Sequence, residues 1–131
     1  MCWTNHIAIP IVLKKPLRVY KVGTVTVLGG FISLCHNFVY LKSKAVPIVK
    51  INLEFIKYNT FSPLDKSWMY NTFCINEGYH SYLNKEIAEY ERNTYGEIGI
   101  FEIPAGATVY INFRHREVVS TNIKYLGKLE L

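Results

Sequence analysis

The stretch Gly78–Tyr82, GYHSY, holds the side chains best suited to chemistry in this sequence. A histidine titrates near neutral pH, so His80 could act as a general base or, when protonated, contact an anion. Ser81 and Tyr82 follow it, and a predicted helix begins just beyond, where free backbone N–H groups could help to hold an anion. A structural histidine bonded to a backbone carbonyl is the alternative. Because the sequence assigns no catalytic partner to His80, we predict a ligand-binding site here and name no catalytic residue.

A second candidate is the tripeptide Arg114–His115–Arg116, which follows a predicted strand. Each guanidinium group can contact two oxygens at once, so two arginines that flank a histidine could clamp a phosphate group. A solvated loop between two strands is the alternative. We therefore take Arg114, His115 and Arg116 as candidate ligand-binding residues.

The charge is unevenly distributed along the chain. The formal net charge is +5, yet the first acidic residue is Glu54. A positive N-terminal half favours an anionic partner: nucleic acid, a phosphorylated small molecule or the acidic face of a protein. The alternative is a solubilising surface that keeps strand edges from pairing. The cations before Glu54 are Lys14, Lys15, Arg18, Lys21, Lys42, Lys44 and Lys50.

Tyrosine is abundant, with ten residues in the chain. Aromatic rings beside cations can stack on nucleotide bases, although sheet proteins also place tyrosine on half-buried strands. Arg18, Tyr20 and Lys21 combine cations with an aromatic ring on one predicted strand. We add these three residues to the candidate ligand contacts.

Several other classes of function have no support in the sequence. The cysteines, Cys2, Cys35 and Cys74, lack zinc-ligand spacing, and no phosphate-binding glycine loop or nucleophile motif is present. No apolar run approaches the ~18–20 residues of a membrane-spanning helix, and the first residues do not resemble a secretory signal. We expect a cytoplasmic protein with no metal, no cofactor and no membrane contact, and we favour a binding protein over an enzyme.

The elements that position these candidates are mainly strands, because alternation with period 2 dominates the sequence. A helix is predicted over 84–93, with Asn84 as its N-cap and Glu86 in its first turn. The segment Pro104–Ala107 suits a type II turn. We expect one α+β domain spanning 1–131, with a small, mostly antiparallel sheet of five to seven strands and one packed helix. The predicted strands or extended segments are 17–27, 31–41, 48–56, 68–75, 98–103, 108–113 and 118–126, with a turn at 29–30 and a loop at 57–66.

The order of motifs resembles a group of small uncharacterised proteins from bacteriophages and gut bacteria. That group shares a V-Y-K strand, a G-[FY]-H-S-[FY] step before a helix, an I-P-x-G-[AS] hairpin and a terminal strand entered through a serine. Tyr20–Lys21, Gly78–Tyr82, Pro104–Tyr110 and Ser120 match this pattern, whereas residues 28–70 depart from it. The resemblance implies a phage-related origin and an α+β fold, and it implies no particular activity.

A glycine-histidine step before a helix is also similar to small domains compared with ADP-ribosyltransferases, which bind NAD. That resemblance implies an early-strand role for Arg18 and a late-strand role for Glu102 or Glu117. The serine-threonine-serine step expected between these positions is missing.

Three functions follow as hypotheses. The first is a non-enzymatic, phage-type accessory protein that sequesters an anionic, nucleotide-like ligand of host-defence signalling. The second is an inhibitor that binds a host protein through its basic face, and the third is an enzyme that processes NAD or a nucleotide. Direct nucleic-acid binding is a further option, and exposed strand edges leave homo-oligomerisation open.

Overall fold

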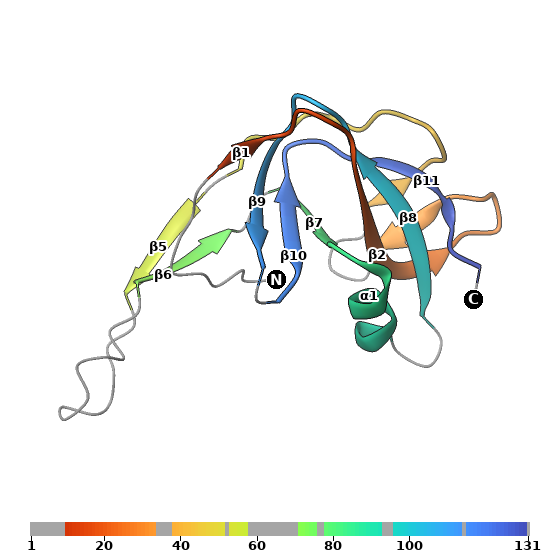
Figure 1. The fold of residues 1–131 in the computed structure, drawn as a ribbon. Coiled ribbons are helices and arrows are strands. Elements are labelled where there is room, and N and C mark those ends of the chain that lie inside the picture. Colours follow the sequence, from red (N-terminus) through yellow and green to blue (C-terminus); the bar gives the residue numbers. More distant parts are fainter. Residues whose placement is uncertain are drawn as a thin grey trace.

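The structure is a computed structural model that describes residues 10–33, 38–51, 53–57, 71–75, 78–92, 96–113 and 115–130. Within these ranges the fold is mainly β, with one short helix and a nine-stranded sheet (Figure 1). The strands are β1 (Ile11–Val12), β2 (Leu17–Val25), β3 (Phe31–Ser33), β4 (Val39–Tyr40), β5 (Leu53–Lys57), β6 (Asn71–Ile75), β7 (Tyr79–Tyr82), β8 (Glu97–Ile103), β9 (Thr108–Asn112), β10 (Glu117–Ser120) and β11 (Lys124–Lys128), and the helix is α1 (Lys85–Glu91).

The main sheet has the strand order β1-β9-β10-β7-β2-β3-β4, with β8 paired to β2 and β11 paired to β8. Every described pairing is antiparallel. Strands β5 and β6 pair with each other as a separate ribbon, which lies to one side of the sheet in Figure 1.

Strand β2 is central because it pairs along both edges. Residues 17–23 pair with β8, while on the other edge Tyr20 lies opposite Tyr82 of β7 and residues 23–25 pair with β3. The chain after β4 returns to β11, where Ala45 makes an isolated bridge with Lys124. The sheet therefore curls, and its two arms approach each other beyond β4 and β11.

Alternate residues of β2 lie on opposite faces, as the sequence predicts. Leu17 and Val19 pack in the main core, and the rings of Phe31, Phe101 and Tyr125 there have centroids 5.1, 5.3 and 5.4 Å apart. We call this side of the sheet the core face. Tyr20 and Val22 lie on the opposite side, the outer face, where α1 covers part of it.

Helix α1 confirms the predicted helix over a shorter span. Asn84 caps it, with its side chain accepting a hydrogen bond from the Ile87 N–H at 3.3 Å, and the helix ends before Arg92. Ala88 is fully buried against Val22 and Ile98. No helix in the described ranges is long and apolar enough to cross a membrane.

The predicted turn Pro104–Ala107 is also confirmed. The Ala107 N–H donates to the Pro104 carbonyl at 3.2 Å, and Gly106 has a φ of 87°. A type II turn requires this positive φ, which glycine adopts without steric cost. The turn joins β8 to β9.

Two expectations for the strands need correction. The strands outnumber the five to seven predicted, because β1 and β7 were not expected and the predicted segments 31–41 and 118–126 each contain two strands. The strand predicted over 48–56 begins only at Leu53. The loop predicted over 57–66 lies outside the described residues after Lys57, and of the segment 68–75 only Asn71–Ile75 is described, as β6.

The predicted terminal strand 118–126 is in fact two strands with different partners. Strand β10 pairs with β7 and β9, whereas β11 pairs with β8. The break lies at 121–123, where the Asn122 side chain accepts from the Ile123 N–H at 2.9 Å. Such a local hydrogen bond competes with the ladder and ends the strand.

Candidate functional site

The exposed cations of the N-terminal half give the described residues a basic surface. Six of the seven cations before Glu54 are exposed, and the described residues 10–51 contain no carboxylate side chain. We define the basic band as the five of them that lie in connecting segments: Lys14, Lys15, Lys42, Lys44 and Lys50.

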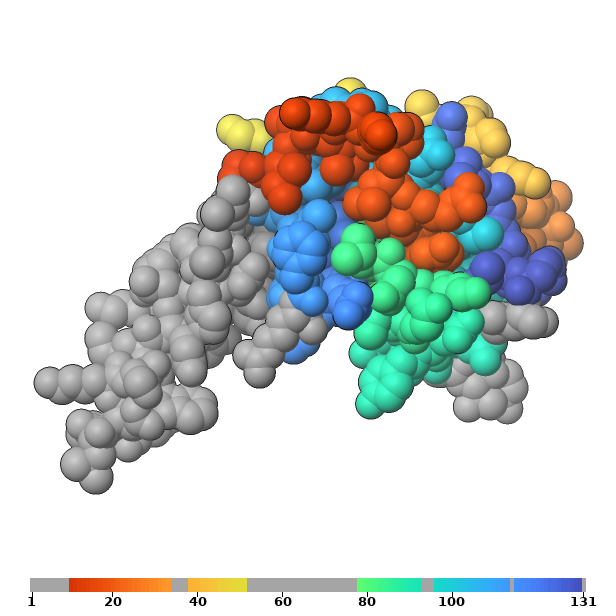
Figure 2. Space-filling view, viewed as in Figure 1, coloured from red at the N-terminus to blue at the C-terminus, as the bar shows by residue number. Residues whose placement is uncertain are grey.

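Backbone hydrogen bonds link two segments of the basic band, around Val12 and Val49, through Thr108 and Thr121. Val12 pairs with Thr108, whose carbonyl accepts from the Thr121 N–H at 3.1 Å, and the Thr121 carbonyl accepts from the Val49 N–H at 3.0 Å. Residues 10–16 (red) and 41–51 (gold to yellow) accordingly follow the same upper edge in Figures 1 and 2. The band is thus a tertiary feature built from lysines up to 36 positions apart in the sequence.

Lys21 is the exception among these cations. It lies on the core face, only 5% exposed, with Nζ 5.4 Å from the centroid of the Tyr40 ring and 5.9 Å from that of Phe101. Both distances suit cation–π contacts. Burial, with a smaller effect of Tyr79, raises the pKa of Tyr40, so the ring that faces Lys21 is a neutral phenol. Lys21 therefore has an internal role and is not exposed for a surface ligand.

The other candidates on β2 and β7 divide between the two faces. Tyr20 and Tyr82 are half-buried on the outer face, opposite each other, and Arg18 is exposed on the same face, opposite Glu102 of β8. Ser81 is buried on the core face, opposite Val118. The candidates thus do not converge on one side of the sheet.

His80 lies within strand β7 and not at a strand-to-helix corner. It is half-buried on the outer face opposite Val119, and its Nε2 atom is buried. Asn84 already caps the seven-residue helix that follows. Ser81 faces away from His80, and among the described residues its Oγ atom has no hydrogen-bond partner. The geometry offers these residues no shared contact with one anion.

Of the Arg114–His115–Arg116 tripeptide, Arg114 lies outside the described residues. His115 and Arg116 are exposed in the turn between β9 and β10, where Arg116 has a φ of 54°. The Asn112 side chain accepts from the His115 N–H at 3.3 Å, and the Arg116 carbonyl accepts from the Leu83 N–H at 2.7 Å. The backbone of this turn is therefore held against the start of the helix, while the side chains of His115 and Arg116 remain exposed.

Glu117 follows this turn and lies opposite Tyr82 on the outer face. Burial raises the pKa of its carboxyl group, His115 lowers it by a smaller amount, and Glu91 raises it. A half-buried carboxylate beside His115 and Arg116 weakens the attraction of this turn for an anion. The turn is thus a less favourable anion site than the basic band.

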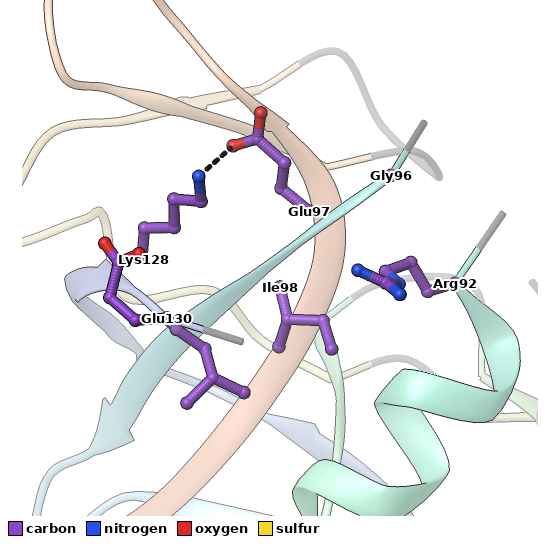
Figure 3. A pocket seen from close by; sticks show the side chains of 7 residues that line it. Arg92, Gly96, Glu97, Ile98, Lys128 and Glu130 are labelled. Atoms are coloured by element: carbon purple, nitrogen blue, oxygen red, sulfur yellow. Dashed lines mark ion pairs between the residues drawn. The ribbon is translucent and has the colours of Figure 1, made fainter. Parts of the chain in front are cut away.

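Two hollows lie elsewhere, at the end of α1. One has a cavity volume of about 260 Å³, and Figure 3 shows Arg92 extending from the helix end toward Ile98 of β8. Lys128 and Glu97 form an ion pair on its other side, with Nζ and Oε2 4.0 Å apart. The second hollow, of about 420 Å³, shares Arg92 with the first. The sequence offered no sign of this site beyond a cation near a helix end.

The described residues contain no group of three histidine, cysteine or acidic side chains able to hold a metal ion. No protein-family model, curated protein or solved structure matches the chain.

Proposed function

We propose that this protein is a non-enzymatic accessory binding protein that docks on the acidic face of a partner protein through the basic band. The observation that supports this function is the gathering of Lys14, Lys15, Lys42, Lys44 and Lys50 along one edge with no carboxylate among the described residues 10–51. Such a field raises the rate of encounter with an acidic surface and selects against basic ones.

An extended partner suits this surface better than a single small molecule. Small-molecule sites are usually concave and enclose most of the ligand. The described hollows lie at the end of α1, and no lysine of the basic band lines either of them. For a phage-related chain, the partner would be a host protein.

The proposal is tested by charge reversal with a matched control. Tagged wild-type protein should retain one stoichiometric protein from host extract, with retention that weakens as salt is raised, since exposed charges are screened. Lys14→Glu/Lys15→Glu should lose that protein, whereas Lys85→Glu/Arg116→Glu, two exposed cations outside the band, should keep it. Equal loss in both double variants, or a partner that proves to be nucleic acid, would refute docking through the band.

A nucleotide-like ligand is the second candidate, and one observation favours it: Arg92 lines both hollows at the end of α1. A guanidinium group there could contact a phosphate, with Lys128 nearby. A ligand at roughly 100 times its Kd adds about 2.7 kcal/mol to the free energy of unfolding, which in a chain of this size raises Tm by several degrees. A panel of nucleotides, cyclic oligonucleotides and NAD should give such a shift, and Arg92→Ala should abolish it. A flat panel would exclude this candidate and, with it, the NAD-processing alternative.

A further inference from the structure

The tip of the β2–β3 hairpin presents two apolar side chains to solvent. Val27 is 104% exposed and Leu28 is 95% exposed. The turn is closed without them: the Thr26 N–H donates to the Gly30 carbonyl at 2.7 Å, and the Thr26 hydroxyl accepts from the Gly30 N–H at 2.8 Å. Gly29 supplies the positive φ of 83°. The backbone therefore fixes the shape of the tip and leaves Val27 and Leu28 free to contact something else.

Strand β4 lies directly beside the tip of the hairpin. A Cβ atom built on Gly30 would lie 3.2 Å from Cγ1 of Val39, so β4 adjoins the turn directly. Val39 and Leu41 are both 46% exposed, on the side of β4 opposite the buried Tyr40. We define the apolar strip as Val27, Leu28, Val39 and Leu41. Contiguous exposed apolar surface of this kind marks an interaction site more often than scattered apolar residues do.

Lysines border the apolar strip at its β4 end. Lys42 and Lys44 are exposed in a turn closed by the Lys44 N–H donating to the Leu41 carbonyl at 3.1 Å. The Ser43 N–H donates to the Tyr125 carbonyl at 2.8 Å, which holds this turn against β11, where Lys124 and Lys128 are exposed. Three carboxylates lie in this region: Glu97, paired with Lys128, Glu102, opposite Lys124, and Glu130. Four lysines therefore border the strip against three carboxylates, and Lys42 and Lys44 lie in a segment whose sequence contains no carboxylate.

We propose that the apolar strip is a contact surface for an anionic lipid bilayer, with Val27 and Leu28 entering the headgroup boundary and Lys42 and Lys44 contacting the lipid phosphates. Binding of this type combines burial of apolar side chains with attraction of lysines to anionic lipids. In Figure 2 the hairpin (orange) projects at the right-hand edge beside the segment that follows β4 (gold), so both can reach one plane.

The charge distribution favours this occupant over a second copy of the chain. A symmetric contact with the strip along the twofold axis would bring Lys42 and Lys44 of one copy toward the same lysines of the other, where like charges oppose association, whereas an anionic bilayer attracts these lysines directly. The inference shares Lys42 and Lys44 with the basic band, but Val27 and Leu28 lie outside that band, so the tip variant tests bilayer contact separately from the proposed protein partner.

The test uses co-sedimentation with vesicles of phosphatidylcholine plus phosphatidylserine, compared with phosphatidylcholine alone. Wild-type protein should sediment with the anionic vesicles and much less with the neutral ones. Val27→Ser/Leu28→Ser should weaken that binding roughly tenfold or more, because two apolar side chains no longer enter the bilayer. The matched control, Tyr90→Ser/Phe113→Ser, removes two exposed aromatic side chains elsewhere and should change binding less than about twofold.

A second pair of variants separates local contact from general charge attraction. Lys42→Gln/Lys44→Gln should weaken binding by roughly fivefold for each lysine at low salt. Lys14→Gln/Lys15→Gln has the same net charge and should weaken it much less, because these lysines lie away from the tip. The proposal is overturned by wild-type protein that fails to bind anionic vesicles. It is also overturned if the two lysine variants lose vesicle binding equally and Val27→Ser/Leu28→Ser binds as wild type does. Unchanged thermal unfolding confirms that each variant is folded.

Discussion

The two faces of strand β2 present adjacent residues to opposite environments. Tyr20 lies half-buried on the outer face beside Tyr82, whereas Lys21 is enclosed on the core face between the rings of Tyr40 and Phe101. Strand β7 repeats the division, since His80 lies on the outer face and the adjacent Ser81 on the core face. Residue types that look suited to a ligand are therefore divided by the pleat of the sheet.

The comparison shows that residue type is a poor guide to accessibility in a strand. A lysine is normally exposed, yet Lys21 is more deeply buried than the tyrosine beside it. The alternation of β2 required one of the two residues to point inward, and the packing of Phe31 and Phe101 determined which side is the interior. Sites in this protein are thus better sought in connecting segments, where the basic band and the apolar strip lie.

The largest expected effect concerns the aromatic core itself. Phe101→Ala should lower the free energy of unfolding by about 3–5 kcal/mol, because it removes the ring that packs against Phe31, Tyr40 and Tyr125. Tyr110→Ala, on the outer face, should cost about 1 kcal/mol. Denaturant unfolding of both variants measures the difference, and similar losses would mean that the two faces are equally packed.

The next effect contrasts the two cations of β2. Lys21→Glu should cost at least about 3 kcal/mol, because it places a carboxylate in a buried site against the negative faces of two rings. Arg18→Glu, exposed opposite Glu102, should cost no more than about 1 kcal/mol from like-charge contact across the strands. Chemical denaturation of both variants measures the change in the free energy of unfolding. Equal losses would mean that the Lys21 side chain reaches solvent and does not contact the Tyr40 and Phe101 rings.

The smallest effect is a pH dependence from Glu117. Because burial raises its pKa, the folded state holds this proton more tightly than the unfolded chain does. The stability gained from holding the Glu117 proton is present at low pH. It is lost as the pH rises from the ordinary glutamate range through the raised pKa. Glu117→Gln should therefore gain stability relative to wild type over that rise, by less than about 1 kcal/mol because solvent screens the half-exposed carboxyl group. Tm measured across the pH series checks this, and Glu89→Gln, at an exposed position on α1, is the control. A Tm difference between Glu117→Gln and wild type that stays constant with pH would contradict the prediction.

Several elements could be predicted from the sequence because their signals are local. The helix has a capping asparagine at its start, and the turn at 104–107 has the one glycine that its positive φ requires. The alternation of residues 17–22 also gave the two faces of β2 correctly. The strand predicted over 118–126 was wrong because the apolar pattern continues across the break, while a side-chain hydrogen bond at Asn122 ends the pairing.

The candidate site residues were harder to predict, since accessibility depends on partners that are distant in sequence. The one-sided charge of the N-terminal half was visible in the sequence, and six of its seven cations are indeed exposed. The alternation placed Lys21 on the same face as Leu17 and Val19, but the sequence did not show that this face is the interior. The exposed tip at Val27 and Leu28 was equally hidden, because apolar residues within an alternating strand pattern indicate burial.

The sequence by itself determined the strand-rich character of this protein, its helix and turn, and the excess of cations before Glu54. These follow from side-chain periodicity, capping and charge, which act over a few residues. Only the tertiary structure decided that Lys21 is enclosed by Tyr40 and Phe101 and that the lysines of the basic band share one edge. The physical reason is that backbone ladders form between almost any strand sequences, so the choice of partner strand depends on how the whole core packs.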